Sequence, residues 1–406
     1  MRVTAYTYPW DVARIGVDRV LEDLAGHGID AIDLAASYHP IDTLSPRGDS
    51  VRTFTSPRGA VHFPARIDRY HRIRPSVSSR EISAAWPAIV ERAPSFGLAV
   101  NAWVVVLYQP WIVDAYPDCT RVLPGGDPVG SGVCASNDDV REYVATLCED
   151  LVDQFGVDLI RLEGVAPGGY DYGWLRPRVL VDVPPLAQDL LALCFCQSCV
   201  TKAASSGLDV ERLRRIVTKS IIGEINPGES GEVDEATLGD GEISADPELH
   251  EFVVQHERAS IDLIGAVRSR VGGSIVSRLS TTTWTTYSSL LGADANSLFG
   301  ELADVIDQLL VGQRDAARLE NLVEVEHPRA GAIGRTTLVT PMRNSVPGGM
   351  APLLGVPDEG GLGGRVRAYL ELVAPLGLEE VCLYNYGLLR DRDIRDIIGA
   401  VTAVWG

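Results

Sequence analysis

Three cysteines lie close together in ALCFCQSC, residues 192–199, in a chain with seven cysteines among 406 residues. Their C-x-C-x-x-C spacing allows three thiolates to reach one tetrahedral Zn²⁺ at about 2.3 Å each. Cys148 and Cys382 stand among apolar residues, as core cysteines do, which leaves Cys119 and Cys134 for a fourth ligand. We expect Cys134, in the loop-like segment GSGVCASNDD, to complete a structural zinc site with Cys194, Cys196 and Cys199. A cluster of thiols without metal is the alternative.

Glu163 is a second candidate for chemistry because it ends the apolar run VDLIRLE, residues 157–163. A carboxyl at the end of a buried strand, among aromatic rings, is desolvated and therefore suited to general acid–base catalysis near neutral pH. The structural alternative is a salt bridge to Arg161 or Arg278, since Arg161 shares one face of the strand with Glu163. We predict that Glu163 is the catalytic residue.

Aromatic and polar side chains gather where the expected strands end, although aromatic residues make up only 7% of the chain. Flat rings offer apolar faces to sugar C–H bonds and leave phenol and indole groups for sugar hydroxyls. Any one ring is more often ordinary packing than a ligand contact. Their shared placement predicts a site for a glycoside or another polyhydroxylated small molecule, with the candidate binding residues Tyr8, Trp10, His39, Trp103, Trp174, Arg278, Trp284, Gln313, Tyr384 and Asn385.

Short β-rich runs alternate with amphipathic helical stretches along the chain, which is the rhythm of a parallel sheet. The expected strands are 3–9, 31–37, 98–106, 157–163, 274–280, 305–311, 336–341 and 380–386. The expected helices include 17–26, 83–96, 139–155, 250–271 and 362–376. This order predicts an α/β fold, a single (β/α)8 TIM-barrel domain over 1–406, with chemistry at the carboxyl ends of its strands. A doubly wound sheet has a similar rhythm, but no Rossmann fingerprint follows the first strand.

Two connections are too long for simple loops and predict insertions after strands two and four. The first runs from His39 to about Arg80, and the second contains the cysteine cluster. Between Lys219 and Arg258 there is no Lys or Arg, while acidic residues recur. We expect 219–250 to be an acidic, mobile insertion, and a dispensable surface segment is favoured over a catalytic lid.

Further charged residues leave two questions open. Asp304, Asp307, Asp315, Glu324 and Glu326 are candidates for a second catalytic carboxyl, but none is placed clearly at a strand end. The basic segment 62–75 would suit an anion or carboxylate, although a solvated loop is the commoner explanation of such basicity.

The overall charge limits the classes of partner. A net charge of −19 argues against nucleic acid and anionic membranes, because such partners require many Lys and Arg residues. The N-terminus lacks the pattern of a secretory signal, and no apolar run reaches the ~18 residues of a membrane span. We therefore expect a cytoplasmic protein, in which clustered thiols favour metal or redox chemistry over disulfides.

The order VCASNDDVREYVATLCEDLVDQFGVDLIRLEG, followed by CFCQSC, resembles glycoside hydrolase family 42, the β-galactosidases of the clan A barrels. The resemblance covers roughly residues 130–200. It implies that Cys134 and the three clustered cysteines hold a structural zinc, that Glu163 is the acid/base, and that the protein forms a homo-oligomer. Two positions depart from the family. Leu162 stands where the family has Asn, and the seventh strand, TTLVTPMRN, ends without the nucleophilic Glu.

These observations predict a glycoside-hydrolase-like enzyme that acts on a glycoside or polyhydroxylated small molecule through Glu163. Two alternatives remain. An isomerase, lyase or cyclase on the same scaffold would use Glu163 for proton transfer without a nucleophile, and a sugar-binding protein would carry out no catalysis.

Overall fold

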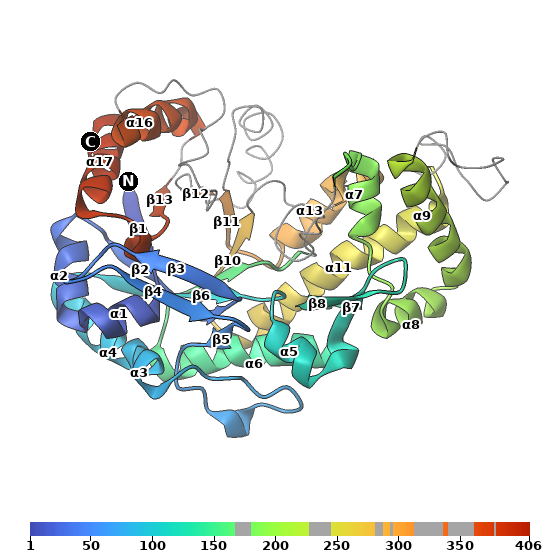
Figure 1. The fold of residues 1–406 in the computed structure, drawn as a ribbon, viewed down its shortest axis with the longest axis horizontal. Helices are drawn as coiled ribbons and strands as arrows, with labels where there is room; N and C mark the ends of the chain where they lie inside the picture. The colour runs from blue at the N-terminus through green and yellow to red at the C-terminus, as the bar shows by residue number, and fades with distance from the viewer. Residues whose placement is uncertain are drawn as a thin grey trace.

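The computed structural model describes residues 1–166, 180–226, 245–280, 287–292, 295–311, 336–339, 361–376 and 379–406. Its fold is α/β, with helices arranged around a parallel sheet (Figure 1). Of the positions predicted above, Trp174, Trp284, Gln313, Asp315, Glu324 and Glu326 lie outside the described residues.

The sheet contains eight parallel strands among the described residues, and each overlaps one of the expected runs. Each strand pairs in parallel with the next one named here, and the last pairs with the first. In that order they are β1 (Arg2–Thr7), β2 (Ala31–Tyr38), β6 (Ala99–Val105), β9 (Leu159–Glu163), β10 (Ile275–Ser280), β11 (Gln308–Val311), β12 (Thr336–Val339) and β13 (Glu380–Leu383).

The long helices follow from the spacing of their apolar residues. In α6 (Asp138–Phe155), Val140, Val144, Leu147 and Leu151 recur at helical spacing and are buried. The side chain of Asn137 caps its first turn, and Gly156 ends it in the left-handed conformation with φ 60°. The other principal helices are α1 (Pro9–Ile15), α2 (Val17–Gly26), α4 (Ala85–Arg92), α11 (Pro247–Arg270), α13 (Ala295–Ala303), α16 (Gly361–Val373) and α17 (Asp391–Trp405).

Two connections carry several elements of their own. Between β2 and β6 lie a hairpin of β3 (Ile41–Ser45) and β4 (Arg52–Ser56), then β5 (Ala60–Val61) and α3 (Arg80–Ser83). Between β9 and β10 lie α7 (Pro185–Leu191), α8 (Gln197–Ser205), α9 (Val210–Ile225) and α11. Helices α9 and α11 extend into the acidic tract 219–250 from both sides, and 227–244 lie outside the described residues.

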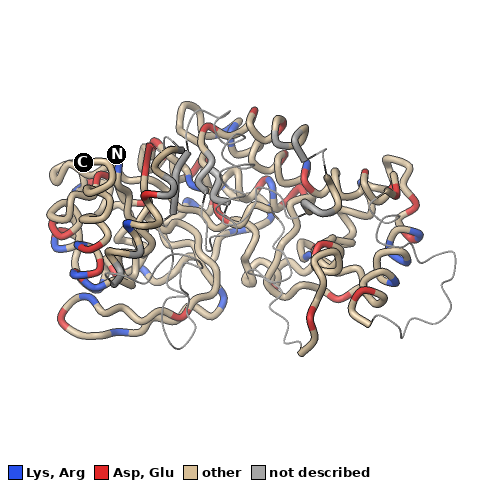
Figure 2. Tube along the Cα trace, turned by 90° about the horizontal axis from the view of Figure 1, so that it is seen from above, with Lys and Arg blue, Asp and Glu red and all other residues tan. Residues whose placement is uncertain are grey.

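Charges of both signs are interspersed along the described chain rather than gathered on one face (Figure 2). The basic segment 62–75 is tied to acidic side chains of the same chain, in the pairs Arg66–Asp150 at 2.6 Å, Arg69–Asp153 at 2.5 Å and Arg72–Asp118 at 2.7 Å. These ion pairs explain the basic segment without a bound anion.

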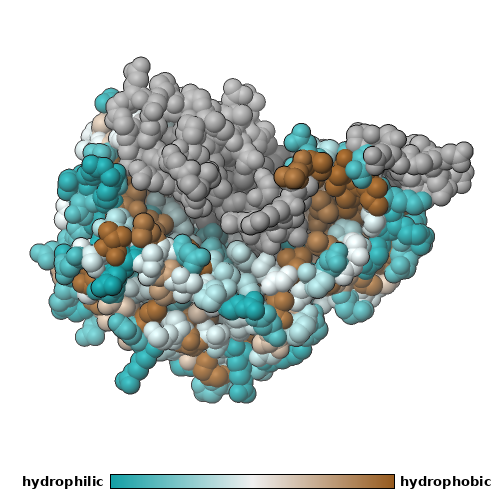
Figure 3. All heavy atoms as spheres, in the orientation of Figure 1, coloured by the Kyte–Doolittle hydropathy of each residue, from teal (hydrophilic) through white to brown (hydrophobic). Residues whose placement is uncertain are grey.

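The described surface also has exposed apolar side chains. Leu180 and Val181, before α7, and Ile222, on α9, are exposed, and Figure 3 shows apolar surface over this end of the molecule. No described helix is both long enough and apolar enough to cross a membrane.

Candidate functional site

The four cysteines predicted as metal ligands lie together, and all are buried. Their sulfur atoms are all within 4.8 Å of one another. Sγ of Cys134 is 3.5 Å from that of Cys199 and 3.9 Å from that of Cys194. Four thiolates around a tetrahedral Zn²⁺ at about 2.3 Å stand about 3.8 Å apart, so this arrangement fits a metal of that kind. The cluster could therefore hold a metal ion.

Neighbouring elements fix the cluster from several parts of the chain. The backbone N–H of Cys134 donates to the carbonyl of Cys119 at 2.9 Å, and Phe195 donates to Val122 of the β7 strand (Thr120–Val122) at 2.7 Å. Cys196 is the N-cap residue of α8. Cys119, the alternative fourth ligand, is not in the cluster, and its thiol lies 3.8 Å from Oδ1 of Asn137.

The thiols affect one another strongly. Hydrogen bonds within the cluster raise the pKa of Cys134 and of Cys199 well above the usual value. Burial raises the pKa of Cys194, but hydrogen bonds from the other three thiols outweigh it and hold that pKa well below its usual range. The pKa of Cys196 is lowered, first by its hydrogen bond with Cys134. Cysteine binds a metal as the thiolate, so a metal bound here would favour deprotonation of these thiols.

Glu163 lies at the carboxyl end of β9, where its half-buried side chain accepts a hydrogen bond from Trp103. The indole Nε1 of Trp103 is 2.7 Å from Oε2 of Glu163. Trp103 is fully buried, and the rings of Tyr6 and Tyr38 meet it edge-on at centroid distances of 4.6 and 4.7 Å. Because this packing fixes the indole, the Glu163 carboxyl has a fixed partner at one oxygen.

Three tyrosine hydroxyls form a closed triangle beside Trp103. The hydroxyl of Tyr8 is 3.1 Å from that of Tyr38 and 2.8 Å from that of Tyr384, and the third side measures 2.9 Å. Burial raises the pKa of Tyr8 and of Tyr38 well above the usual value, so these phenols remain protonated. The triangle therefore supplies hydroxyl groups, not phenolates, at this end of the strands.

Arg161 belongs to a buried polar network on the inner side of the sheet. Its Nε is 2.6 Å from Oδ2 of Asp33, and its Nη2 is 3.3 Å from Oε1 of Glu380. Further hydrogen bonds in the network join Arg161 to Ser277 and Gln308, and Asp33 to Asn101. The expected alternative for Arg161, a salt bridge to Glu163, is thus replaced by two carboxylates from other strands. The side chain of Arg278, the other partner considered, is not described.

The two carboxyls of the network differ in their acidity. Burial raises the pKa of Asp33 despite the nearby Arg161 charge. Burial also acts on Glu380, but the Arg161 charge and the hydrogen bond from Thr4 outweigh it, so the pKa of Glu380 is lowered. Sequence reasoning missed this network. The sequence feature that could have revealed it is a charged residue inside an apolar run, namely Asp33 in AIDLAAS and Arg161 in DLIRLE.

The remaining described candidates are placed as follows. Trp10 is buried, with Tyr8 stacked on one face at 4.2 Å and Phe54 on the other at 4.3 Å. His39 is half-buried and stacks on Tyr108 at 4.9 Å. Asn385 is buried, and its side-chain oxygen accepts a 3.0 Å hydrogen bond from Gly387. Tyr8, Trp10, Trp103 and Tyr384 therefore belong to one aromatic group.

Two candidates for the second catalytic carboxyl, Asp304 and Asp307, lie at the opposite end of the sheet from Glu163. Asp307 precedes β11, pairs with Arg268 at 2.5 Å and accepts a hydrogen bond from the backbone of Val276 at 2.8 Å. Asp304 precedes the same strand. Both residues are thus at the amino end of β11, away from the strand ends where Glu163 lies.

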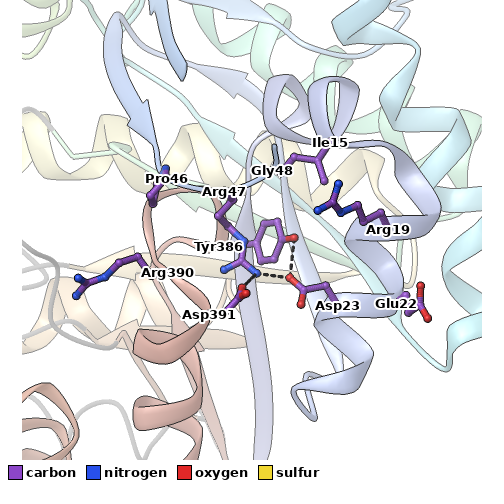
Figure 4. A pocket seen from close by; sticks show the side chains of 10 residues that line it. All are labelled: Ile15, Arg19, Glu22, Asp23, Pro46, Arg47, Gly48, Tyr386, Arg390 and Asp391. Carbon is purple, nitrogen blue, oxygen red and sulfur yellow. Dashed lines mark hydrogen bonds and ion pairs between the residues drawn. The ribbon is translucent and has the colours of Figure 1, made fainter. Parts of the chain in front are cut away.

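A pocket of about 410 Å³ lies apart from this site, between α2, the β3–β4 connection and the start of α17 (Figure 4). Arg47 reaches between the carboxylates of Asp23 and Asp391, and its guanidinium lies 4.1 Å over the ring of Tyr386. The other two arginines at the pocket have carboxylate partners of their own, in the pairs Arg19–Asp49 and Arg390–Asp393. Its cations are therefore neutralised within the protein.

Comparison with known proteins identifies a class of fold. No family model matches the chain, and no curated protein matches it. Among solved structures, α-L-fucosidase isoenzyme 2 from Paenibacillus thiaminolyticus is 12% identical to this chain, with a TM-score of 0.56. The match covers 99% of this chain and 49% of the fucosidase chain. The β-galactosidase from the psychrophilic Marinomonas ef1 is 14% identical, with a TM-score of 0.53. That match covers 99% of this chain and 59% of the galactosidase chain.

A third match is a separate domain. The PgaB (BpsB) glycoside hydrolase domain from Bordetella bronchiseptica is 14% identical with a TM-score of 0.53, and the match covers 98% of this chain and 99% of that domain. The chain spans about half the length of the fucosidase and somewhat more of the galactosidase. At these identities the matches show the fold alone, and the chain has a glycoside-hydrolase-like α/β fold.

Proposed function

We propose that the protein is a glycoside hydrolase that acts on a glycoside or polyhydroxylated small molecule, with Glu163 as general acid and base. The observation that carries the proposal is the position of Glu163 at the carboxyl end of β9, with one oxygen held by Trp103. In α/β barrels the chemistry is found at this end of the strands. The glycoside-hydrolase-like fold supports the same reaction class.

The proposed scaffold is a (β/α)8 barrel with insertions after its second and fourth strands. It is supported by parallel pairings that run through eight strands and return from β13 to β1. Kinship with glycoside hydrolase family 42 is the finer form of the proposal. It rests on the resemblance around residues 130–200 and on the cysteines that lie together in the structure.

The proposed metal is one structural Zn²⁺ per chain, held by Cys134, Cys194, Cys196 and Cys199. When bound, it would join the loop before α6 to the segment before α8. A closed Cys₄ site leaves no position for substrate, so its contribution is stability rather than chemistry. The sulfur separations of 3.5 and 3.9 Å support this proposal.

Glu163 would act in two proton transfers. In the first, its protonated carboxyl donates a proton to the glycosidic oxygen as the bond from that oxygen to the anomeric carbon breaks. The second transfer applies to a retaining reaction, in which a second carboxyl first bonds to the anomeric carbon; the Glu163 carboxylate then takes a proton from the water whose oxygen displaces that carboxyl. The Trp103 hydrogen bond orients the carboxyl in both steps, because the packed indole does not have to reorganise.

The proposal includes the remaining parts of the predicted site. The candidate substrate contacts at this mouth are the tyrosine hydroxyls of Tyr8 and Tyr384 and the ring of His39, with Trp174, Arg278, Trp284 and Gln313 proposed from sequence. A cytoplasmic location and a homo-oligomeric state are also part of the proposal. Sedimentation of the full chain tests the oligomeric state.

The decisive experiment compares two leaving groups. Glu163→Gln keeps the shape of the side chain and removes proton transfer. Turnover of disaccharides, whose leaving group needs a proton, should fall by about 10²–10⁴-fold, while nitrophenyl glycosides, whose leaving group departs without one, should lose less. Glu91→Gln, at an exposed position of α4, is the matched control. Equal losses for both substrates, or unchanged turnover of the disaccharide, would remove Glu163 from this role.

The stereochemistry of the product reports on the second catalytic group. Retention requires a carboxyl about 5–5.5 Å from Glu163, and inversion requires one about 6.5–9.5 Å away. Proton NMR of the first-formed sugar distinguishes the two anomers. An active protein that releases no sugar from any glycoside, but rearranges or eliminates within a polyhydroxylated substrate, would favour the isomerase or lyase alternative.

A further inference from the structure

We infer that the cysteine cluster positions Glu163 through a linking segment, residues 106–108, so that metal binding at the cluster and the geometry at Glu163 are coupled. The linking segment continues β6 beyond its last residue and lies between the end of β9 and the strand β8 (Pro128–Val133). Cys134 follows β8 directly. The inference rests on the proposed metal site, but it does not depend on hydrolysis by Glu163.

On one side, the linking segment is bonded to the end of β9. The backbone N–H of Val106 donates to the carbonyl of Glu163 at 2.8 Å, and the N–H of Leu107 donates to the carbonyl of Gly164 at 3.2 Å. These bonds extend the pairing of β6 with β9, in which Val105 lies opposite Glu163. They fix the backbone of the proposed catalytic residue against the linking segment.

On the other side, the linking segment is bonded to the strand that precedes the cluster. The carbonyl of Leu107 accepts a 3.0 Å hydrogen bond from the N–H of Val133, and Tyr108 pairs with Gly132 in an antiparallel bridge. Leu107 is therefore bonded through its N–H to the residue after Glu163 and through its carbonyl to the residue before Cys134. One residue joins the two sites.

Side-chain packing connects the same parts. Leu107 is 1% exposed, and it borders a cavity of about 20 Å³ together with Val133, Cys134 and Cys194. A cavity of this size has room for about one water, so little free space separates the leucine from the two proposed ligands. Close-packed interiors transmit small displacements. We therefore expect a displacement of these cysteines on loss of the metal to reach Leu107.

Two contacts near Glu163 depend on the linking segment. Trp103 lies on β6, three residues before the segment, and its indole N–H donates to Glu163 at 2.7 Å. Tyr108, the last residue of the segment, stacks on His39 at 4.9 Å. A shift of the segment would alter both contacts. Because coupling between two sites is reciprocal, a change in the segment should also alter the affinity of the cluster for its metal.

The first test compares the full chain with bound Zn²⁺ and after removal of the metal by EDTA. Without metal, hydrogen exchange measured by NMR should be about tenfold faster at the amides of Val106, Leu107 and Val133, because their hydrogen bonds open more often. The indole resonance of Trp103, assigned with Trp103→Phe, should shift. The control is the amide of Ile397 in α17, which lies away from β7 and β8 (Figure 1) and should not change.

The second test starts from the zinc-loaded protein, so it applies even if the metal-free chain does not fold. Leu107→Ala keeps both backbone hydrogen bonds and removes the packing beside the cluster. Competition with a chromophoric chelator should show zinc binding weakened by about tenfold, and the Trp103 indole resonance should shift. Leu24→Ala, at a fully buried leucine of α2 on the side of the molecule away from β7 and β8 (Figure 1), is the matched control and should change neither.

Each result supports or overturns the coupling. If zinc binds but its removal changes neither the exchange of the three amides nor the Trp103 resonance, the coupling is overturned and the metal site stands. Faster exchange at Ile397 as well would mean that the whole chain opens without metal, and the second test then decides. Equal zinc affinity of Leu107→Ala and Leu24→Ala overturns the coupling. A chain that binds no zinc overturns the metal site and the coupling together, whereas absence of hydrolase activity overturns neither.

Discussion

The indole N–H of Trp103 donates a 2.7 Å hydrogen bond to Oε2 of Glu163, across the pairing of β6 with β9. The sequence predicts Trp103 as a substrate-binding ring. In the structure it is fully buried, and its polar edge is directed at the proposed catalytic carboxyl. We therefore propose that Trp103 positions Glu163 and does not stack against substrate. The two roles predict different effects when Trp103 is replaced.

Trp103→Phe should keep most of the aromatic packing and remove the hydrogen bond. A hydrogen bond to the ionised carboxylate favours that form, so its loss should move the basic limb of the pH–rate profile to higher pH, by up to about one unit. The effect should fall mainly on kcat. Trp111→Phe is the matched control, since the buried Trp111 indole donates to Gln109 at 2.9 Å instead. The same pH limb in both variants would contradict a positioning role.

The buried network around Arg161 should dominate the stability of the sheet interior. Arg161→Met leaves Asp33 and Glu380 buried without their shared cation, which should lower the free energy of unfolding by about 3–5 kcal/mol. Arg92→Met breaks the exposed pair with Asp18, whose side chains are 47% and 64% exposed, and should leave the free energy of unfolding nearly unchanged. Urea unfolding of the two variants measures both values. Equal, small losses would show that the network is not a source of stability.

These residues also show where sequence reasoning ends. The eight strands were predictable because buried parallel strands read as short apolar runs. The association of Cys134 with three cysteines some sixty residues later was predictable because few side chains satisfy a thiophilic metal. The ion-pair partners of Arg161 were not predictable, because Asp33 and Glu380 reach it across the sheet. No local spacing in the sequence specifies such a contact. The burial of Trp10 and Trp103, and the faces that they bury, depend on tertiary packing that no local spacing specifies.

Acid should destabilise the protein through His62. This residue is buried with both ring nitrogens unpartnered, and burial lowers its pKa to about 3. Its folded-state pKa lies below the ~6.5 of an unfolded histidine, so its contribution to stability is complete above about pH 6.5 and is lost as the pH falls toward 3. Each pH unit in that window should cost about 1.4 kcal/mol.

His62→Leu should remove this acid-dependent loss. Urea midpoints at pH 7, 5.5 and 4.5 should fall less steeply for the variant than for the natural sequence. His71→Leu, at a side chain that is 77% exposed, removes a histidine without altering a buried site and should leave the slope unchanged. Parallel pH dependence of all three proteins would mean that His62 becomes charged without unfolding.

The thiol cluster should hold zinc, and losing one ligand should release it. Cys196→Ser removes a buried thiol at the N-cap of α8, where three remaining sulfurs cannot close a tetrahedral site. Elemental analysis should fall from about one zinc per chain to near zero, and the melting temperature should fall with it, because metal binding contributes to folding free energy. Cys119→Ser is the control, since this buried thiol lies outside the cluster. Full zinc occupancy in Cys196→Ser would overturn the site. If Cys134→Ser retains zinc and Cys119→Ser loses it, the fourth ligand is Cys119 and not Cys134, and the other three ligands are unchanged.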